Sequence, residues 1–181
     1  MENENGHTFR IEKIKEIELS LQNDRDERDV LSKRYSKTYK WFSNLEIVLI
    51  VVSLGLGATG VCLLSTIKAI QSVVALESIT IGINVLSIIG KIWSQKFSLK
   101  AEKHKEVKIL AESKLNVISD MISKSSDGRV SDLEFSIILA EYKKYQETKN
   151  NIIEKIQNLV GSAFDDIKNN LRSNNLYKNF N

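Results

Sequence analysis

The sequence predicts an all-α chain in which a two-span transmembrane hairpin continues into long helices of a cytoplasmic bundle or coiled-coil stalk. Three observations lead to this fold class. The 181 residues contain no proline, although average usage of about 5% would give about nine. Proline breaks helix interiors, so its absence permits long helices. Two extended apolar runs follow one another, and the segments outside them carry apolar residues at helical spacing.

The first predicted element is an amphipathic helix over residues 1–46, which runs directly into the first span. Residues 9–46 contain neither glycine nor proline. Asp24 and Arg28 occupy two positions of an otherwise apolar seam, so the helix has a polar interruption. The apolar members of the seam are spaced three or four apart, with that interruption between them: Ile14, Ile17, Leu21, Leu31 and Tyr35.

The second predicted element is the transmembrane hairpin over residues 47–92, with spans at about 47–67 and 70–92. Residues 47–67 are 21 residues without a charge. At about 1.5 Å per residue this length covers a hydrocarbon core of about 30 Å. The second apolar run carries one charge, Glu77, near its start. The alternative is a buried hairpin within a soluble helical bundle.

The residues that flank the spans predict the orientation in the membrane. Lysine and arginine crowd both outer flanks, whereas only Lys68 lies between the runs. The positive-inside rule therefore places both termini in the cytoplasm, without identifying the membrane. Trp41 and Trp93 lie at the cytoplasmic ends of the spans, where tryptophan favours the interface.

Small residues one helical turn apart predict helix packing within the spans. Ser53 and Gly57 are four apart in the first span, and Ser78 and Gly82 are four apart in the second. Such pairs allow helix backbones to approach closely in lipid. They would pack either the two helices of one hairpin or neighbouring copies of the chain in a homo-oligomer.

Two polar residues of the second span are candidates for lining a pore. Asn84 needs a partner in hydrocarbon, either across the helices or in the water of an assembled pore. Glu77 would form a ring at the outer mouth or act as an ordinary interfacial charge. Two helices cannot enclose a channel, so any pore requires an oligomer.

Residues 93–172 predict a cytoplasmic helical hairpin, followed by a flexible tail at 173–181. The turn "SKSSDGRVSDLEF" resembles a calcium loop, but Ser123 and Ser125 replace two of its ligands, so no calcium is expected. The structural interpretation makes Asp127 and Gly128 the turn, and Ser131 with Glu134 a capping box. Two apolar stripes mark the helices on either side of the turn: Val107, Ala111, Leu115, Ile118 and Ile122, then Phe135, Ile138, Tyr142, Tyr145, Ile152, Ile156, Leu159 and Ile167.

Other chemistry is not indicated by the sequence. His7 and His104 are isolated among charged residues, without a metal cluster, nucleophile or phosphate loop nearby. We therefore expect no enzyme, cofactor or metal. The formal net charge of +3 is too balanced to indicate nucleic acid as a partner. The expected partners are the lipid bilayer, further copies of the chain and an unidentified cytoplasmic protein.

The stretch "KAEKHKEVKILAESKLNVISDMISKSSDGRVSDLEFSIILAEYKKY" resembles uncharacterised two-span proteins of invertebrate genomes, over about residues 25–150. Those proteins carry a similar "LAxxKLNxIxxxISK…DGxISDxEF" pattern after a hairpin of spans. More distantly, the plan of two spans and a cytoplasmic helical extension resembles the SLATT domain. That resemblance implies a pore-forming effector, but it assigns no catalytic or ligand residue.

Three functions follow as hypotheses. The first is an oligomeric two-span membrane protein that forms a pore or otherwise perturbs the membrane. The second is a membrane-anchored helical interaction module without a pore. The third is a soluble α-helical pore-forming toxin with a concealed hydrophobic hairpin.

Overall fold

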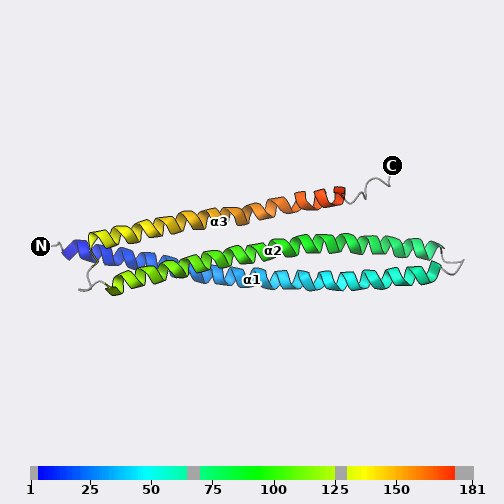
Figure 1. Cartoon of the computed structure of the whole chain (residues 1–181), viewed down its shortest axis with the longest axis horizontal. Coiled ribbons are helices and arrows are strands. Elements are labelled where there is room, and N and C mark those ends of the chain that lie inside the picture. The colour runs from blue at the N-terminus through cyan, green and yellow to red at the C-terminus, as the bar shows by residue number, and fades with distance from the viewer. Residues whose placement is uncertain (1–3, 65–69, 125–129, 174–181) are drawn as a thin grey trace. The chain divides into compact units, whose positions relative to one another are not determined.

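The computed structural model describes residues 4–64, 70–124 and 130–173, with side chains described at residues 6–59, 73–123 and 130–159. It contains three long helices, α1 (Glu4–Leu64), α2 (Ile70–Lys124) and α3 (Asp132–Ser173) (Figure 1). No strand occurs in these ranges. The predicted all-α class is therefore confirmed.

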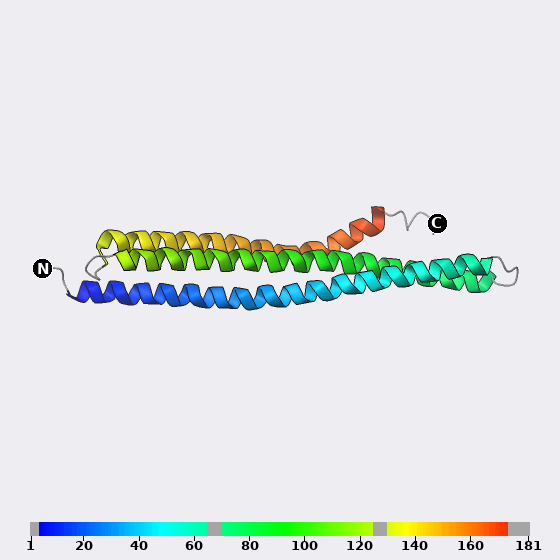
Figure 2. The ribbon, with the colours of Figure 1, turned by 60° about the horizontal axis from the view of Figure 1, so that its bottom comes forward.

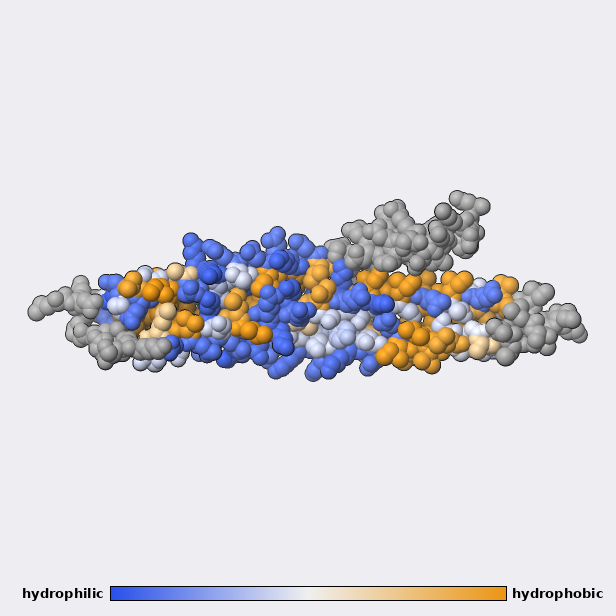
Figure 3. All heavy atoms as spheres, in the orientation of Figure 1, coloured by the Kyte–Doolittle hydropathy of each residue, from blue (hydrophilic) through white to orange (hydrophobic). Residues whose placement is uncertain are grey.

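The chain divides into two compact units, and both α1 and α2 pass through each of them. The bundle unit comprises Met1–Arg34 and Lys100–Asn158, and the hairpin unit comprises Tyr35–Leu99 and Leu159–Asn181. In two views, α1 and α2 run side by side (Figures 1 and 2). Coloured by hydropathy, the hairpin parts of α1 and α2 carry broad apolar surfaces (Figure 3). The segments predicted at 1–46, 47–92 and 93–172 were delimited by hydropathy. The two units are delimited by packing, so their boundaries are not the same.

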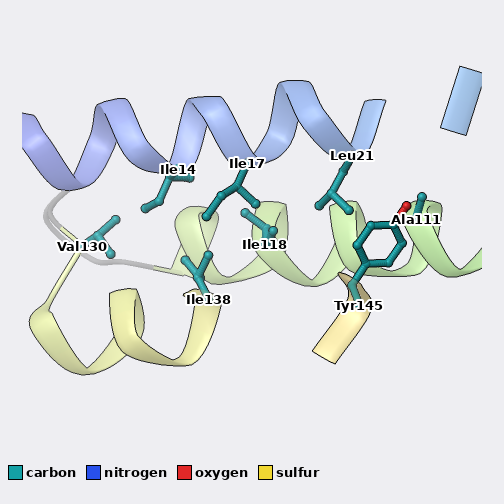
Figure 4. Close-up of a cluster of buried hydrophobic side chains, with 8 residues drawn as sticks. All are labelled: Ile14, Ile17, Leu21, Ala111, Ile118, Val130, Ile138 and Tyr145. Carbon is teal, nitrogen blue, oxygen red and sulfur yellow. The ribbon is translucent and has the colours of Figure 1, made fainter. Parts of the chain in front are cut away.

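The bundle unit has an apolar core to which all three helices contribute. Figure 4 shows these side chains pointing toward one another from α1, α2, α3 and, at Val130, from the segment just before α3. Each helix presents apolar residues three or four apart, and this spacing keeps one face of a helix against its neighbours. The buried positions confirm the predicted stripes on all three helices in this unit. The core consists of Ile14, Ile17, Leu21, Ala111, Ile118, Val130, Ile138 and Tyr145.

The start of α3 has the predicted capping box. The backbone N–H of Glu134 donates to the Ser131 hydroxyl at 3.2 Å, and the backbone N–H of Ser131 donates to the Glu134 carboxylate at 2.8 Å. These two bonds satisfy backbone donors that the first turn of a helix leaves open. Asp127 and Gly128, the predicted turn, lie outside the described residues.

Candidate functional site: an apolar hairpin and a buried polar layer

The hairpin parts of α1 and α2 expose apolar side chains around most of their circumference. Each helix contains a window long and apolar enough to cross a membrane; none of the window in α1 and 11% of that in α2 is buried. Helices that are apolar all round are characteristic of protein cores or membrane spans. We call the exposed large aliphatic residues from 47 to 86 the apolar belt: Ile47, Val48, Ile50, Val51, Val52, Leu54, Val74, Ile79, Ile81 and Leu86.

A narrow seam joins α1 and α2 within the hairpin unit. Buried and partly buried positions recur at intervals of three or four residues on both helices, which is the spacing of two helices in side-by-side contact. Several seam positions of α2 carry small or hydroxyl side chains, and the Ser87 Oγ is buried. The seam consists of Phe42, Leu45, Leu49, Ser53 and Leu56 on α1, and of Val73, Leu76, Thr80, Ile83, Ser87 and Gly90 on α2.

A polar contact crosses the seam in the middle of the apolar segment. The Ser53 hydroxyl donates to the Asn84 side-chain oxygen at 2.9 Å. Asn84 remains exposed at the edge of the seam, whereas Ser53 is partly buried. Of the two alternatives that the sequence left open for Asn84, this bond is the partner across the helices. The Asn84 side chain still lies on the exposed surface of the hairpin.

The two span glycines are not close-approach points within the single hairpin, which was one of the two alternatives for them. A Cβ atom added at Gly57 or Gly82 would meet nothing within 4 Å. Ser78 is exposed and bonds to the carbonyl of Val74 in its own helix at 2.9 Å. Of the four small residues, only Ser53 lies in the seam, because the seam follows a different stripe of each helix. Packing of Gly57 and Gly82 against a second copy stays a prediction.

Glu77 and Asn84 share a side of α2. They are seven residues apart, which is about two turns of a helix, and both are exposed. A single orientation of α2 could therefore turn both Glu77 and Asn84 toward the axis of an assembly, as the two predicted pore roles require. Neither role is tested by the geometry of a single chain.

An aromatic cluster lies at the end of the hairpin that adjoins the lysine-rich flanks. The Phe97 ring lies 5.5 Å from Phe42, 5.8 Å from Trp93 and 6.0 Å from Tyr35, centroid to centroid. Trp41 packs edge-on against Phe42 at 4.9 Å. These contacts link Trp41 and Trp93 at the same end of the hairpin, as interface anchors require. The sequence analysis missed Phe42 and Phe97, although both lie within four residues of a tryptophan.

The bundle unit contains a buried polar layer at the level of the predicted seam interruption. Asp24 accepts hydrogen bonds from the Tyr145 hydroxyl at 2.9 Å and from the Lys149 ammonium at 2.8 Å. The Lys149 ammonium also lies 5.6 Å from the centroid of the Tyr145 ring. Burial, and then the Asp24 carboxylate, raise the pKa of the Tyr145 phenol far above its usual value. Tyr145 therefore stays protonated and donates to Asp24.

The second part of the layer pairs Arg28 of α1 with His104 of α2. Their side-chain nitrogens lie 3.5 Å apart, and His104 is only 4% exposed. Burial, and then the neighbouring Arg28 charge, lower the pKa of the His104 imidazole. His104 is therefore a buried residue of the helix interface, which its charged sequence neighbours did not indicate. No cluster of metal-ligating side chains occurs among the residues that the structure describes.

These features define an all-helical protein with two helices long and apolar enough to span a membrane. The chain is similar to Uncharacterized protein 259R of Invertebrate iridescent virus 6, with 29% identity over 158 residues. The similarity covers 87% of this chain and 51% of the viral protein, so the chain spans about half the length of that relative. No protein-family model and no solved structure matches the chain. The two resemblances drawn from the sequence are not shown by these comparisons.

Proposed function

We propose that this chain is an oligomeric two-span membrane protein with its bundle unit and both termini in the cytoplasm. The observation that carries the proposal is the apolar belt. In water, an exposed apolar surface of this extent is unfavourable and marks an interaction site. In a bilayer the same side chains face hydrocarbon, and each helix satisfies its own backbone hydrogen bonds.

Asn84 supports assembly within the membrane. Its amide N–H₂ donors lie on the exposed surface of the hairpin, and lipid tails offer them no acceptor. A second copy supplies an acceptor at the same depth. The open positions at Gly57 and Gly82 let a further helix approach the backbone closely.

A pore is the activity that this assembly favours. Copies that turned the Glu77 and Asn84 side of α2 inward would surround a path with polar groups at two levels. The belt residues on the other sides of the helices would then face lipid. Such a path disrupts the barrier of a membrane, which agrees with the pore or membrane-perturbing function expected from the sequence.

The second candidate is a membrane-anchored interaction module, and the Ser53–Asn84 bond favours it. That bond satisfies the Asn84 oxygen within one chain, so a single hairpin is compatible with a bilayer. The third hypothesis, a soluble toxin with a concealed hairpin, gains no support, because the apolar windows have 0% and 11% of their residues buried.

Carbonate extraction of vesicles that contain the full chain tests the proposed insertion. Leu54→Arg, at a position 70% exposed in the belt and nearer the middle of the first span, should reduce the carbonate-resistant fraction, since arginine at mid-bilayer costs about 3 kcal/mol or more. Leu19→Arg, at a position 59% exposed in the bundle unit, is the matched control and should stay resistant. Complete extraction of the unmutated chain would reject insertion. Dye release from the same vesicles then separates the pore from the anchor.

A further inference from the structure

The net charge of the chain is concentrated in the segment that forms the hairpin. Residues 35–99 contain five lysines and two glutamates, whereas the rest of the chain contains 21 cationic and 21 anionic side chains among Lys, Arg, Asp and Glu. The whole formal surplus of +3 therefore belongs to residues 35–99. The unbalanced charge thus lies in the predicted hairpin and in the residues that flank it.

Three lysines of this segment, Lys37, Lys40 and Lys91, are exposed and form no ion pair with the residues described. Exposed lysines of the bundle unit, such as Lys15 and Lys143, are unpaired among the described residues too. What distinguishes the first three is therefore their position in the hairpin unit. We call these three residues the basic collar. Their charges have no carboxylate partner among the side chains that the structure describes, so they are available to an anion from outside.

The collar lies at the same end of the hairpin as the aromatic cluster. Lys40 precedes Trp41 directly, and Lys91 precedes Trp93 by two residues, or about 3 Å along a helix. The rings between these tryptophans are in contact through Phe42 and Phe97. Tryptophan favours the headgroup region of a bilayer. A collar at this level faces the phosphate and carboxylate groups of the lipids.

We propose that the basic collar binds anionic phospholipid headgroups and keeps anionic lipids next to the hairpin; this inference rests on the proposed insertion. The chemistry is charge complementarity between three ammonium groups and headgroup anions. Each lysine near an anionic membrane surface is worth about a fivefold preference at low salt. The apolar belt below the collar accommodates the acyl chains of the same lipids.

Energy transfer from tryptophan to a dansyl-labelled lipid measures this preference. The only two tryptophans of the sequence are Trp41 and Trp93, and both belong to the aromatic cluster, so the signal reports the collar end of the hairpin. The full chain is reconstituted in phosphatidylcholine vesicles with traces of labelled phosphatidylglycerol or labelled phosphatidylcholine. We expect severalfold greater transfer to the labelled phosphatidylglycerol, decreasing as salt is added.

Lys37→Gln/Lys40→Gln/Lys91→Gln should abolish this difference. The control, Lys15→Gln/Lys143→Gln/Lys155→Gln, removes the same charge from exposed positions of the bundle unit and should retain it. Equal energy transfer to both labelled lipids would contradict the proposed binding of anionic headgroups by the basic collar. Equal loss of the difference in both triple variants would contradict it as well. Complete competition by millimolar inorganic phosphate would also overturn it, because the site would then be a general anion site.

Flotation of the same samples distinguishes two negative results: absence of lipid binding by the basic collar and absence of membrane insertion. A chain that floats with neutral vesicles but shows no lipid preference rejects the collar and leaves insertion standing. A chain that binds only anionic vesicles through the collar lysines, and is washed off by 1 M salt, supports the collar and rejects insertion. A chain that binds neither kind of vesicle rejects both.

Discussion

Ser53 of α1 donates a hydrogen bond to the side-chain oxygen of Asn84 of α2 at 2.9 Å, in the middle of an otherwise apolar hairpin. The hydroxyl is partly buried in the seam, and the amide lies at its exposed edge. The bond fixes which sides of the two helices meet, and it leaves the amide donors available to a neighbouring copy.

Asn84→Leu should therefore weaken assembly while leaving insertion intact, because leucine is favourable in hydrocarbon. Interhelical hydrogen bonds in membranes contribute about 1 kcal/mol, so the oligomer should dissociate at about fivefold higher protein-to-lipid ratio. Energy transfer between labelled copies in vesicles measures this change. Ser53→Ala is the control, since it removes the bond within the chain and keeps the amide. An unchanged oligomer in Asn84→Leu would contradict the proposed contact.

Gly57→Ile and Gly82→Ile distinguish contacts within one chain from contacts between copies. Added side chains at these positions meet open space in the single chain, so the thermal stability of a monomer in detergent should be unchanged. If either glycine lies between copies, the isoleucine separates the helices, and native gels should show a smaller species with reduced dye release. A variant that loses monomer stability would show that the glycine packs within its own hairpin after all.

Asp24→Leu should destabilise the bundle unit, because it leaves the largely buried Lys149 ammonium, 14% exposed, without a counter-charge. Removing one partner of a buried ion pair costs about 3 kcal/mol or more. The double variant Asp24→Leu/Lys149→Met removes both charges and should recover most of that loss. Urea unfolding of the full chain in micelles, followed by circular dichroism, gives both values. Equal destabilisation in the single and double variants would show that the pair is not coupled.

The stability of the bundle should fall as pH decreases from about 7 to 5. Burial and the Arg28 charge lower the pKa of His104 in the folded state, while an unfolded histidine titrates near about 6.5. The unfolded chain therefore binds more protons in this range, and protonation favours unfolding. Glu27 opposes this shift, and Lys100 adds to it. His104→Gln should flatten the dependence of the unfolding free energy on pH, and an equal slope in both proteins would contradict this assignment.

Carboxylates in the same unit act at lower pH. Bonds from Lys33 and Lys108 lower the pKa of Asp29, and Lys114 lowers that of Glu141. Their contribution to stability is present above the unfolded value of about 4 and is lost as pH falls below it. These carboxylates therefore change little from pH 7 to 5, and the comparison with His104→Gln measures the contribution of His104 in that range.

The sequence predicted the helices and their core faces well, because helical spacing is a local property. Ile14, Ile17 and Leu21 needed only the three-to-four period of α1 to be assigned to the core, and they are buried as expected. Ser131 and Glu134 formed the expected capping box because its two residues are three apart.

The sequence indicated only the α1 residues of the polar layer. Asp24 and Arg28 marked an interruption in one seam, but their partners Lys149 and His104 lie 125 and 76 residues away. Single-chain spacing does not encode which levels of three helices meet. For the same reason, the sequence showed that Gly57 is a small residue in the first span, but it did not show which side of α1 faces α2.

The most direct test of the central claim compares the surroundings of two equally exposed leucines. Leu54 of the belt is 70% exposed, and Leu133 of the bundle unit is 71% exposed. Cys62 is the sole cysteine, so Leu54→Cys and Leu133→Cys in a Cys62→Ser background each carry one spin label. In vesicles, the label at 54 should collide with oxygen and be protected from a water-soluble nickel chelate, and the label at 133 should show the reverse. Equal access of the nickel chelate to both labels would contradict a membrane-spanning hairpin.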